Sequence, residues 1–178
     1  MGPEELASLG LSQELVVIVV SMLPVAELRG ALPVAINIFH FPWYYALLLA
    51  LVGNLLPVPF LLLLFDVCYQ QLSRIAILDR AFNRFFGHVR RRGAIIERYE
   101  RIGLALFVAV PLPVTGAWTG AIAAVIFGLG FRRAFISILA GVFIAGAIVT
   151  TLCLLGWVGA AIAGVALSAL AAFSLWKA

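Results

Sequence analysis

The stretch Met22–Pro33, with the sequence MLPVAELRGALP, places two charged residues between two prolines in an otherwise apolar part of the chain. An ionised side chain at bilayer depth costs about 2.5–3.5 kcal/mol on insertion scales, so such residues usually face a cavity or a partner. Pro24 and Pro33 each lack a backbone donor and disfavour helix at the preceding residue. We therefore expect Glu27 and Arg29 to lie on a broken or re-entrant element that lines a polar cavity.

The composition around this stretch is that of an integral membrane protein. Of the 178 residues, 65% are hydrophobic and 11% are charged, and the mean hydropathy is +1.16. Soluble domains carry about 25% charged residues. Cys68 and Cys153 lie in apolar runs, and His40 and His88 are far apart, so we expect no metal site and no cofactor. The sequence has no nucleophile–base arrangement and no phosphate-binding glycine loop, so we expect no enzymatic activity.

Residues 70–101 form the one polar region of the chain. Apolar residues recur from Leu72 to Val89 in steps of three and four, which predicts a basic amphipathic helix on the membrane surface. We expect Gly93 to end it and a second short helix over Glu97–Arg101 to follow. The membrane-surface arginines are Arg74, Arg80, Arg84, Arg90, Arg91 and Arg92. Anionic headgroups at the cytoplasmic face, rather than nucleic acid, are the expected partner of this segment.

The first half of the chain predicts two short apolar arms and one long span. Ser12 is a candidate N-cap for an arm over Leu15–Leu23, and Pro33–Phe41 forms a second arm. Neither reaches the roughly 20 residues that a membrane span needs, so a re-entrant hairpin fits better than a clean crossing. Trp43–Tyr69 is long enough to span, with its aromatic start at the interface. We expect it to kink where Gly53, Asn54, Pro57 and Pro59 interrupt it.

The second half follows a similar plan. A short arm over Leu104–Leu112 leads into Pro113, and a second short run ends at Leu129. A full span follows over Ala134–Leu155, where Gly141, Ala145 and Gly146 favour close helix contact and would suit a homodimer. A last span is predicted over Trp157–Trp176.

The two halves share a pattern in which Leu-Pro-Val precedes a Gly-Ala pair, at Leu23–Ala31 and again at Leu112–Ala121. Inverted repeats of this kind are weakly visible in sequence. If both broken segments are re-entrant, Arg132, Arg133 and the 70–101 block fall on one side, as the positive-inside rule requires. The two tips would then meet near the midplane.

The predicted architecture is a single all-α membrane domain over 1–178. It comprises a first repeat over 15–69, the basic cytoplasmic segment over 70–101, a second repeat over 102–156 and a last helix over 157–177. Each repeat holds a re-entrant hairpin and a transmembrane helix. The expected location is the plasma membrane, with the basic segment in the cytoplasm.

Three segments, ELRGALP at Glu27–Pro33, GNLLPVPF at Gly53–Phe60 and PLPVTGAWTG at Pro111–Gly120, resemble the small multidrug export protein family. That family is itself similar to the DedA/VTT group of membrane proteins. The resemblance runs from about Leu23 to Leu155. It implies paired re-entrant hairpins, a transporter-like site and proton coupling. Val114 stands where the family pattern has glycine, which would stiffen that tip.

Each candidate site residue has a possible functional role and a possible structural role. Glu27 could load and release a proton, because burial favours the neutral carboxyl and a nearby arginine favours the carboxylate. The alternative is a permanent structural pair with Arg29. Asp66 either shares the cavity or is solvated at the interface. The remaining candidates would contact substrate or satisfy backbone groups freed by proline; they are Pro24, Pro33, Asn54, Pro57, Pro113, Thr115, Gly116, Trp118 and Thr119.

Three functions remain open from the sequence. The first is proton-coupled secondary export of a small organic or cationic substrate, with Glu27 as the acid. The second is a translocase or scramblase of anionic lipids, isoprenyl-phosphate or phospholipid, drawn by Arg29 and the basic segment. The third is a structural membrane protein whose charges are locked in a pair.

Overall fold

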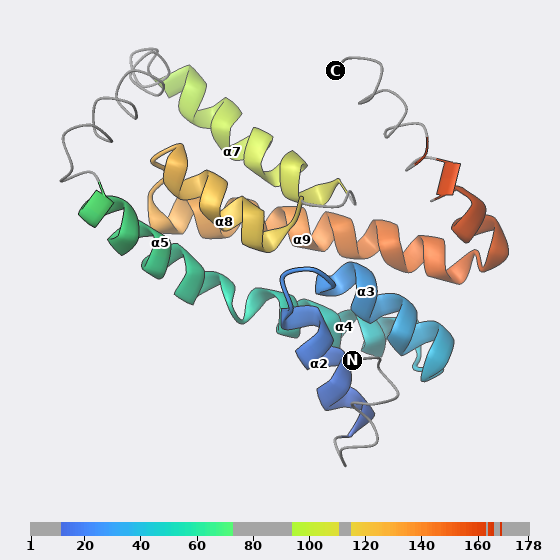
Figure 1. Cartoon of the computed structure of the whole chain (residues 1–178). Coiled ribbons are helices and arrows are strands. Elements are labelled where there is room, and N and C mark those ends of the chain that lie inside the picture. The colour runs from blue at the N-terminus through green and yellow to red at the C-terminus, as the bar shows by residue number, and fades with distance from the viewer. Residues whose placement is uncertain (1–11, 73–93, 111–114, 163, 166–167, 169–178) are drawn as a thin grey trace. The chain divides into compact units, whose positions relative to one another are not determined.

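The computed structural model describes residues 12–72, 94–110, 115–162, 164, 165 and 168 (Figure 1). Within those ranges all regular structure is helical. In chain order, the elements are α2 (Gln13–Met22), α3 (Glu27–Pro33), the π-helical η1 (Val34–Ile38), α4 (Trp43–Leu55), α5 (Val58–Leu72), α7 (Ala94–Ala109), α8 (Ala117–Ile126) and α9 (Phe131–Leu154). A further helical stretch covers 157–162. The predicted basic helix over 72–89 lies outside the described residues.

Two helical stretches among the described residues are long and apolar enough to cross a membrane, by length and composition. They are Trp43–Phe65 and Phe131–Leu154. The second matches the span predicted over Ala134–Leu155. The first matches most of the span predicted over Trp43–Tyr69, including its interruption, because α4 ends at Leu55 and α5 begins after Pro57. Pro59 is accommodated there because the first turn of a helix needs no donor at that position.

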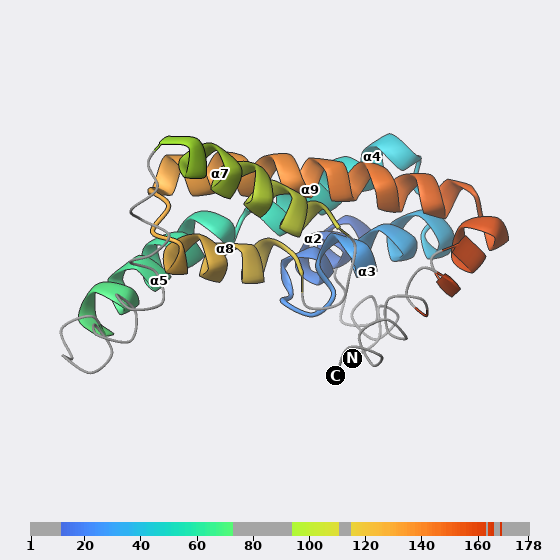
Figure 2. The ribbon, with the colours of Figure 1, turned by 90° about the horizontal axis from the view of Figure 1, so that it is seen from above.

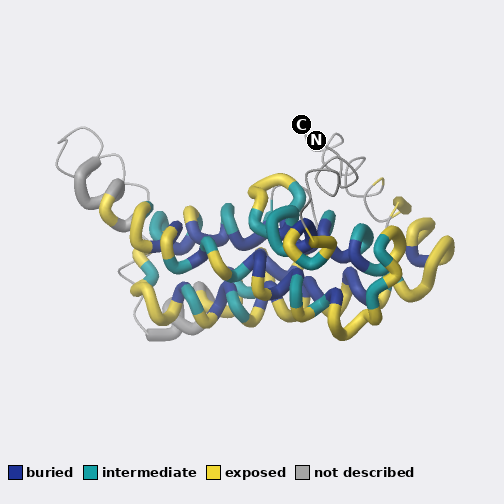
Figure 3. The backbone as a smooth tube through the Cα atoms, turned by 90° about the horizontal axis from the view of Figure 1, so that it is seen from below, coloured by how far each residue is buried: buried dark blue, intermediate teal, exposed yellow. Residues whose placement is uncertain are grey.

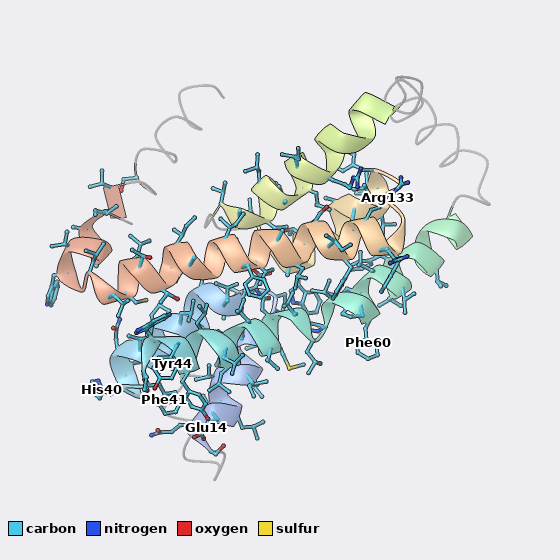
Figure 4. All side chains as sticks on the ribbon, turned by 180° about the vertical axis from the view of Figure 1, so that it is seen from behind. Glu14, His40, Phe41, Tyr44, Phe60 and Arg133 are labelled. Carbon is cyan, nitrogen blue, oxygen red and sulfur yellow. The ribbon has the colours of Figure 1, made fainter. Side chains whose placement is uncertain are left out.

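The outward face of α5 supports placement in lipid. Phe60, Leu63, Leu64 and Val67 are all more than half exposed. Their spacing of three, one and three residues puts them on one side of the helix. Figure 4 shows Phe60 pointing away from its helix, and Figure 3 shows the exposed positions along each helix. An apolar stripe of this kind in water would be an aggregation surface, whereas in a bilayer it is ordinary.

The chain divides into two compact units. The first contains α2, α3, η1, α4 and the part of α9 that begins at Ile144. In its core, Val16 and Val17 of α2 and Leu28 and Leu32 of α3 are buried, and α2 packs against α3 (Figure 2). Gly146 of α9 lies against α4, because a Cβ there would come within 2.9 Å of a Leu47 methyl.

The second unit contains α5, α7, α8 and α9 up to Phe143. Helix α8 packs against both α5 and α7, and its buried residues Ala117, Ala121 and Ala124 are small enough to let those neighbours approach closely. A Cβ on Gly141 of α9 would come within 2.6 Å of the Ala105 carbonyl oxygen of α7. The predicted role of the small residues of α9 in close helix contact is therefore confirmed.

Two predicted boundaries are wrong. Pro33 does not end its helix, because α3 continues into η1, where the amide of Phe39 donates to the Val34 carbonyl five residues earlier at 2.9 Å. A π-helical turn accommodates the donor that proline lacks. The short helix predicted over Glu97–Arg101 is also not separate, because α7 runs unbroken from Ala94 to Ala109.

Candidate functional site

The turn between α2 and α3 leads directly into the two charged residues of the predicted site. Ser12 caps α2, its side-chain oxygen accepting from the Leu15 amide at 3.4 Å, as predicted. The helix ends at Met22, because Pro24 disfavours helical backbone at Leu23. The chain turns over residues 23–26, and the Glu27 amide donates to the Leu23 carbonyl at 3.0 Å. The sequence-predicted break therefore lies where the charged residues begin.

Glu27 is buried and held in an unusual backbone conformation. Its side chain is 5% exposed, although Val25, two residues earlier in the same turn, is 95% exposed. Its φ of 48° lies in the left-handed region, which costs a non-glycine residue about 1–2 kcal/mol. Strain of this kind persists only where the surrounding structure imposes it, and it clusters at functional sites. The fold thus holds a carboxyl side chain away from solvent at a strained position.

Arg29 is half-buried on the same short helix. Its positive charge lies near enough to Glu27 for the two side chains to attract each other electrostatically. Residues two apart diverge on a regular helix, but Glu27 is the first residue of α3 and its φ of 48° departs from that of a right-handed helix. The structure therefore brings this predicted pair together. Both readings of the pair, functional and structural, fit this geometry.

Polar side chains are buried in the first unit on several of its helices. Besides Glu27, they are Ser21 of α2, Asn54 of α4 and Thr150 of α9. The Ser21 hydroxyl donates to the Ala50 carbonyl of α4 at 2.5 Å. Because Ala50 and Asn54 are four residues apart, they share a face of α4. Asn54 therefore lies on the face of α4 that α2 covers.

Gly53 allows α2 and α4 to come this close. A Cβ at this position would collide with the Ile18 backbone carbonyl and would come within 2.9 Å of the Ser21 Cβ. The two helices therefore pack with their backbones nearly in contact, as small residues permit in membrane proteins. This contact fixes the position of the residue that follows it, Asn54.

The Asn54 amide has unused hydrogen-bonding capacity. Its side chain is fully buried, and neither its amide nitrogen nor its carbonyl oxygen has a hydrogen-bond partner among the described residues. The Thr150 hydroxyl is in the same situation. A buried polar group without a partner costs about 1–3 kcal/mol. A site that binds a polar substrate or water would account for that cost.

The predicted second tip belongs to the other unit. Pro113 lies outside the described residues. The Thr115 hydroxyl donates to the Val110 carbonyl at 2.8 Å, and the Thr119 hydroxyl approaches the Gly116 carbonyl at 3.4 Å. Both thus satisfy backbone groups at helix ends, which is the structural reading of these side chains. Trp118 is half-buried on α8.

Other predicted site residues are dispersed. Pro57 lies between α4 and α5, and Pro33 lies inside a continuous helix, as described above. The side chain of Asp66 and the basic residues Arg74, Arg80, Arg84, Arg90, Arg91 and Arg92 lie outside what the structure describes. Within the described residues, no group of three or more His, Cys, Asp and Glu side chains lies together to hold a metal ion.

Ser21 and Thr150 were missed by sequence reasoning. The only signal in the sequence was a hydroxyl within an apolar helix. A hydroxyl that donates to a carbonyl of its own helix gives the same signal. Thr151 does this, since its hydroxyl donates to the Ala147 carbonyl at 2.8 Å. The burial of Ser21 and Thr150 depends on which helix packs over them.

Comparison with known proteins bears on the identity of the chain. A family model described as "Putative small multi-drug export protein" matches residues 27–148. No curated protein and no solved structure matches the chain. The matched range begins at the buried acid and includes both predicted spans up to Ile148. The protein is therefore a membrane protein that belongs to the small multi-drug export protein family.

Proposed function

We propose that this protein is a proton-coupled exporter of a small organic or cationic substrate, and that Glu27 carries the proton. The observation that supports it is a buried carboxyl side chain on a residue with a strained backbone, at the turn between two short helices. Ionisable residues in membrane segments are rare and usually mark ion or substrate pathways. Arg29 modulates the charge of the acid, and the family name supplies the export role.

The two arms around Glu27 form a re-entrant hairpin in this proposal. Helix α2 has 10 residues, or about 15 Å at 1.5 Å per residue. The second arm, α3 with η1, runs from Glu27 to Ile38 and is about 18 Å long by the same rise. Both are shorter than a hydrocarbon core of about 30 Å. The arms pack against each other, so the charged turn would enter the membrane and return.

If the two arms form a re-entrant hairpin, both of its outer ends lie on the same side of the membrane. Single cysteines at Gln13 and His40, in a background without Cys68 and Cys153, should react with a membrane-impermeant maleimide from the same side. Both residues are exposed at the outer ends of the arms; Figure 4 labels His40 and, next to Gln13, Glu14. If α2 and α3 together crossed the bilayer, the two labels would appear on opposite sides.

The re-entrant hairpin also fixes where we place the rest of the chain relative to the membrane. We place the basic segment 70–101 in the cytoplasm of a plasma-membrane protein, following the positive-inside rule. The segment around Thr115 and Trp118 would be the equivalent tip of a second, inverted repeat. A cysteine at Arg91 should then be labelled from the cytoplasmic side only, opposite to His40.

Asn54 is a proposed polar contact of the same site. Replacing Asn54 by Leu, which has the same number of side-chain heavy atoms and the same branching, removes an amide that lacks partners among the described residues. Because apolar replacement of an unsatisfied group is neutral or stabilising, the melting temperature in detergent should hold or rise. Transport should fall at least tenfold. A variant that loses stability and transport together would show that Asn54 has a structural role instead.

The experiment that tests the proposal is proton movement in reconstituted vesicles. Full-length protein is placed in vesicles containing a pH-sensitive dye, and lipophilic cations are added outside one at a time. Proton flux that depends on substrate and exceeds that of protein-free vesicles is expected. Absence of flux with every cation would reject coupled export. The lipid alternative would then be tested in the same vesicles with a labelled anionic lipid.

A further inference from the structure

A pocket in the second unit gathers three arginines from two helices. Arg101 of α7 and Arg132 and Arg133 of α9 line it together with Ile136, and its volume is about 280 Å³. Figure 4 shows Arg133 at the beginning of α9, where the helix follows its connecting turn. All three arginines are exposed. Three cationic side chains therefore come together around one opening, whose own lining is mostly apolar.

The packing of α7 on α9 explains why these residues meet. The helices are in close contact where the Ala105 carbonyl faces Gly141. Arg101 is one turn before Ala105, on the same face of α7. On α9, Ile136 and Arg133 precede Gly141 by five and eight residues. The pocket thus lies toward the N-terminal ends of both helices from their closest contact, and that contact fixes its walls.

Two of the arginines lie in the first turn of α9, where a helix favours anions rather than cations. Arg132 and Arg133 are the second and third residues of a 24-residue helix. The N-terminus of a helix carries partial positive charge, which repels cations in the first turn. The positive-inside rule accounts for basic residues at the end of a span. That rule concerns charge near the end of a span, and it does not by itself place Arg101 of α7 in the same pocket as the first turn of α9.

The size and surroundings of the pocket indicate what kind of anion it takes. Its volume is just below the range of about 300–1,000 Å³ that is typical for drug-sized ligands. Guanidinium groups match phosphate oxygens in geometry and charge. Ile136 in the wall and Ile102 beside Arg101 are both about half exposed, so apolar surface adjoins the charge. We propose that this pocket binds the phosphate group of an anionic membrane lipid.

The location of α9 supports a lipid as the source of the phosphate. Arg132 and Arg133 lie at the beginning of the candidate span Phe131–Leu154, which places them at headgroup depth if that helix crosses the bilayer. Basic pockets between membrane helices are typical headgroup sites. This inference needs only the membrane placement of the chain. It does not require Glu27 or proton coupling, so each proposal can fail alone.

The test is lipid-dependent thermal stabilisation of the full-length protein in a neutral detergent. A ligand that binds only the folded state raises its stability in proportion to occupancy. Addition of phosphatidylglycerol to the micelles should raise the melting temperature of the wild type, whereas phosphatidylcholine should not. The triple variant Arg101→Gln, Arg132→Gln, Arg133→Gln should lose most of this shift. Each shift is measured against the same protein's melting temperature without lipid, so a change in basal stability cannot be mistaken for a loss of binding.

A charge-matched control separates the pocket from general attraction. The variant Arg74→Gln, Arg80→Gln, Arg84→Gln removes the same charge from the basic segment, which attracts anionic headgroups only in a general way. It should lower the lipid-induced shift by clearly less than the pocket variant does. An equal loss in both triple variants would overturn the proposal, as would full retention in the pocket variant. If the pocket variant does not fold, Arg133→Gln and Arg133→Lys replace it, with the shift reduced in the first and largely retained in the second.

A titration with inorganic phosphate tells whether the pocket binds the phosphate group of a lipid or free phosphate. At millimolar concentration and constant ionic strength, it should not reproduce the shift, because it has no acyl chain to pack beside Ile102 and Ile136. A shift of equal size that is lost in the pocket variant would overturn the lipid assignment and identify a site for free phosphate.

Discussion

Replacing Glu27 by Gln is expected to abolish substrate-dependent proton movement, with a loss of at least a hundredfold in the vesicle assay. Glutamine has nearly the shape of protonated glutamate, but it cannot release a proton. Glu27 is the buried acid among the residues whose side chains the structure describes. No other described carboxyl could therefore take over its role. Transport driven by a substrate gradient alone, without proton movement, can persist in the variant.

Glu14→Gln is the matched control. Glu14 lies in the first turn of α2 and is less buried than Glu27, and its removal should leave coupling within twofold of the wild type. If Glu27→Gln retains coupled transport, the proposed mechanism is wrong. If both variants lose it, the effect is not specific to the buried acid.

The stability of Glu27→Gln tells whether Glu27 carries a proton or forms a permanent structural ion pair with Arg29. Removing one partner of a buried ion pair costs about 3–5 kcal/mol, because the other charge stays buried without compensation. A large fall in melting temperature would therefore favour a locked pair with Arg29. Replacement of both residues by leucine without loss of transport would establish it. We expect the single variant to stay folded and to lose coupling.

Gly53→Ala is expected to give the largest loss of stability among conservative substitutions in the first unit. The added methyl group would meet the Ile18 carbonyl and the Ser21 Cβ, and a backbone carbonyl on a packed helix cannot move aside locally. Overpacking of this kind costs about 1–3 kcal/mol. Separation of α2 from α4 would also disrupt the Ser21–Ala50 hydrogen bond. A lower melting temperature in detergent and reduced transport should appear together.

Gly103→Ala provides the comparison. Gly103 lies within α7, and a Cβ there meets nothing within 4 Å among the described atoms. Alanine is favoured over glycine inside a helix by about 1 kcal/mol, so this variant should melt at the same or a higher temperature. A similar fall in both variants would mean that the close approach of α2 and α4 is not what makes Gly53 necessary.

Local chemistry explains what could be predicted about the fold. Pro24 and Pro57 mark the ends of α2 and α4, because proline disfavours helical backbone at the residue before it. Ser12 was identified as a cap because its hydroxyl can reach an amide within the same turn. The predicted break at Pro33 is wrong because tertiary packing, not local chemistry, decides the backbone there. Packing of α3 and η1 against α2 stabilises a helix that local preference would end.

The candidate site was predicted where its signal was a charge or a run of helix breakers within an apolar segment. Glu27 and Arg29 stand out for that reason. Asn54 was identified through its place in a run of helix breakers, and its lack of partners among the described residues became visible only with the packing around it. Thr115 and Thr119 were candidates on equal terms, but the structure shows their hydroxyls at helix-end carbonyls.

The sequence by itself determined that the chain is an apolar membrane protein, helical in the part that the structure describes, with a break before Glu27, because hydropathy and proline act locally. Only the tertiary structure decided that Glu27, Asn54 and Thr150 are buried, and that Arg101 shares a pocket with Arg133. Those properties depend on contacts between segments far apart in the chain. Such contacts are selected by close helix packing, which leaves little trace in the order of the residues.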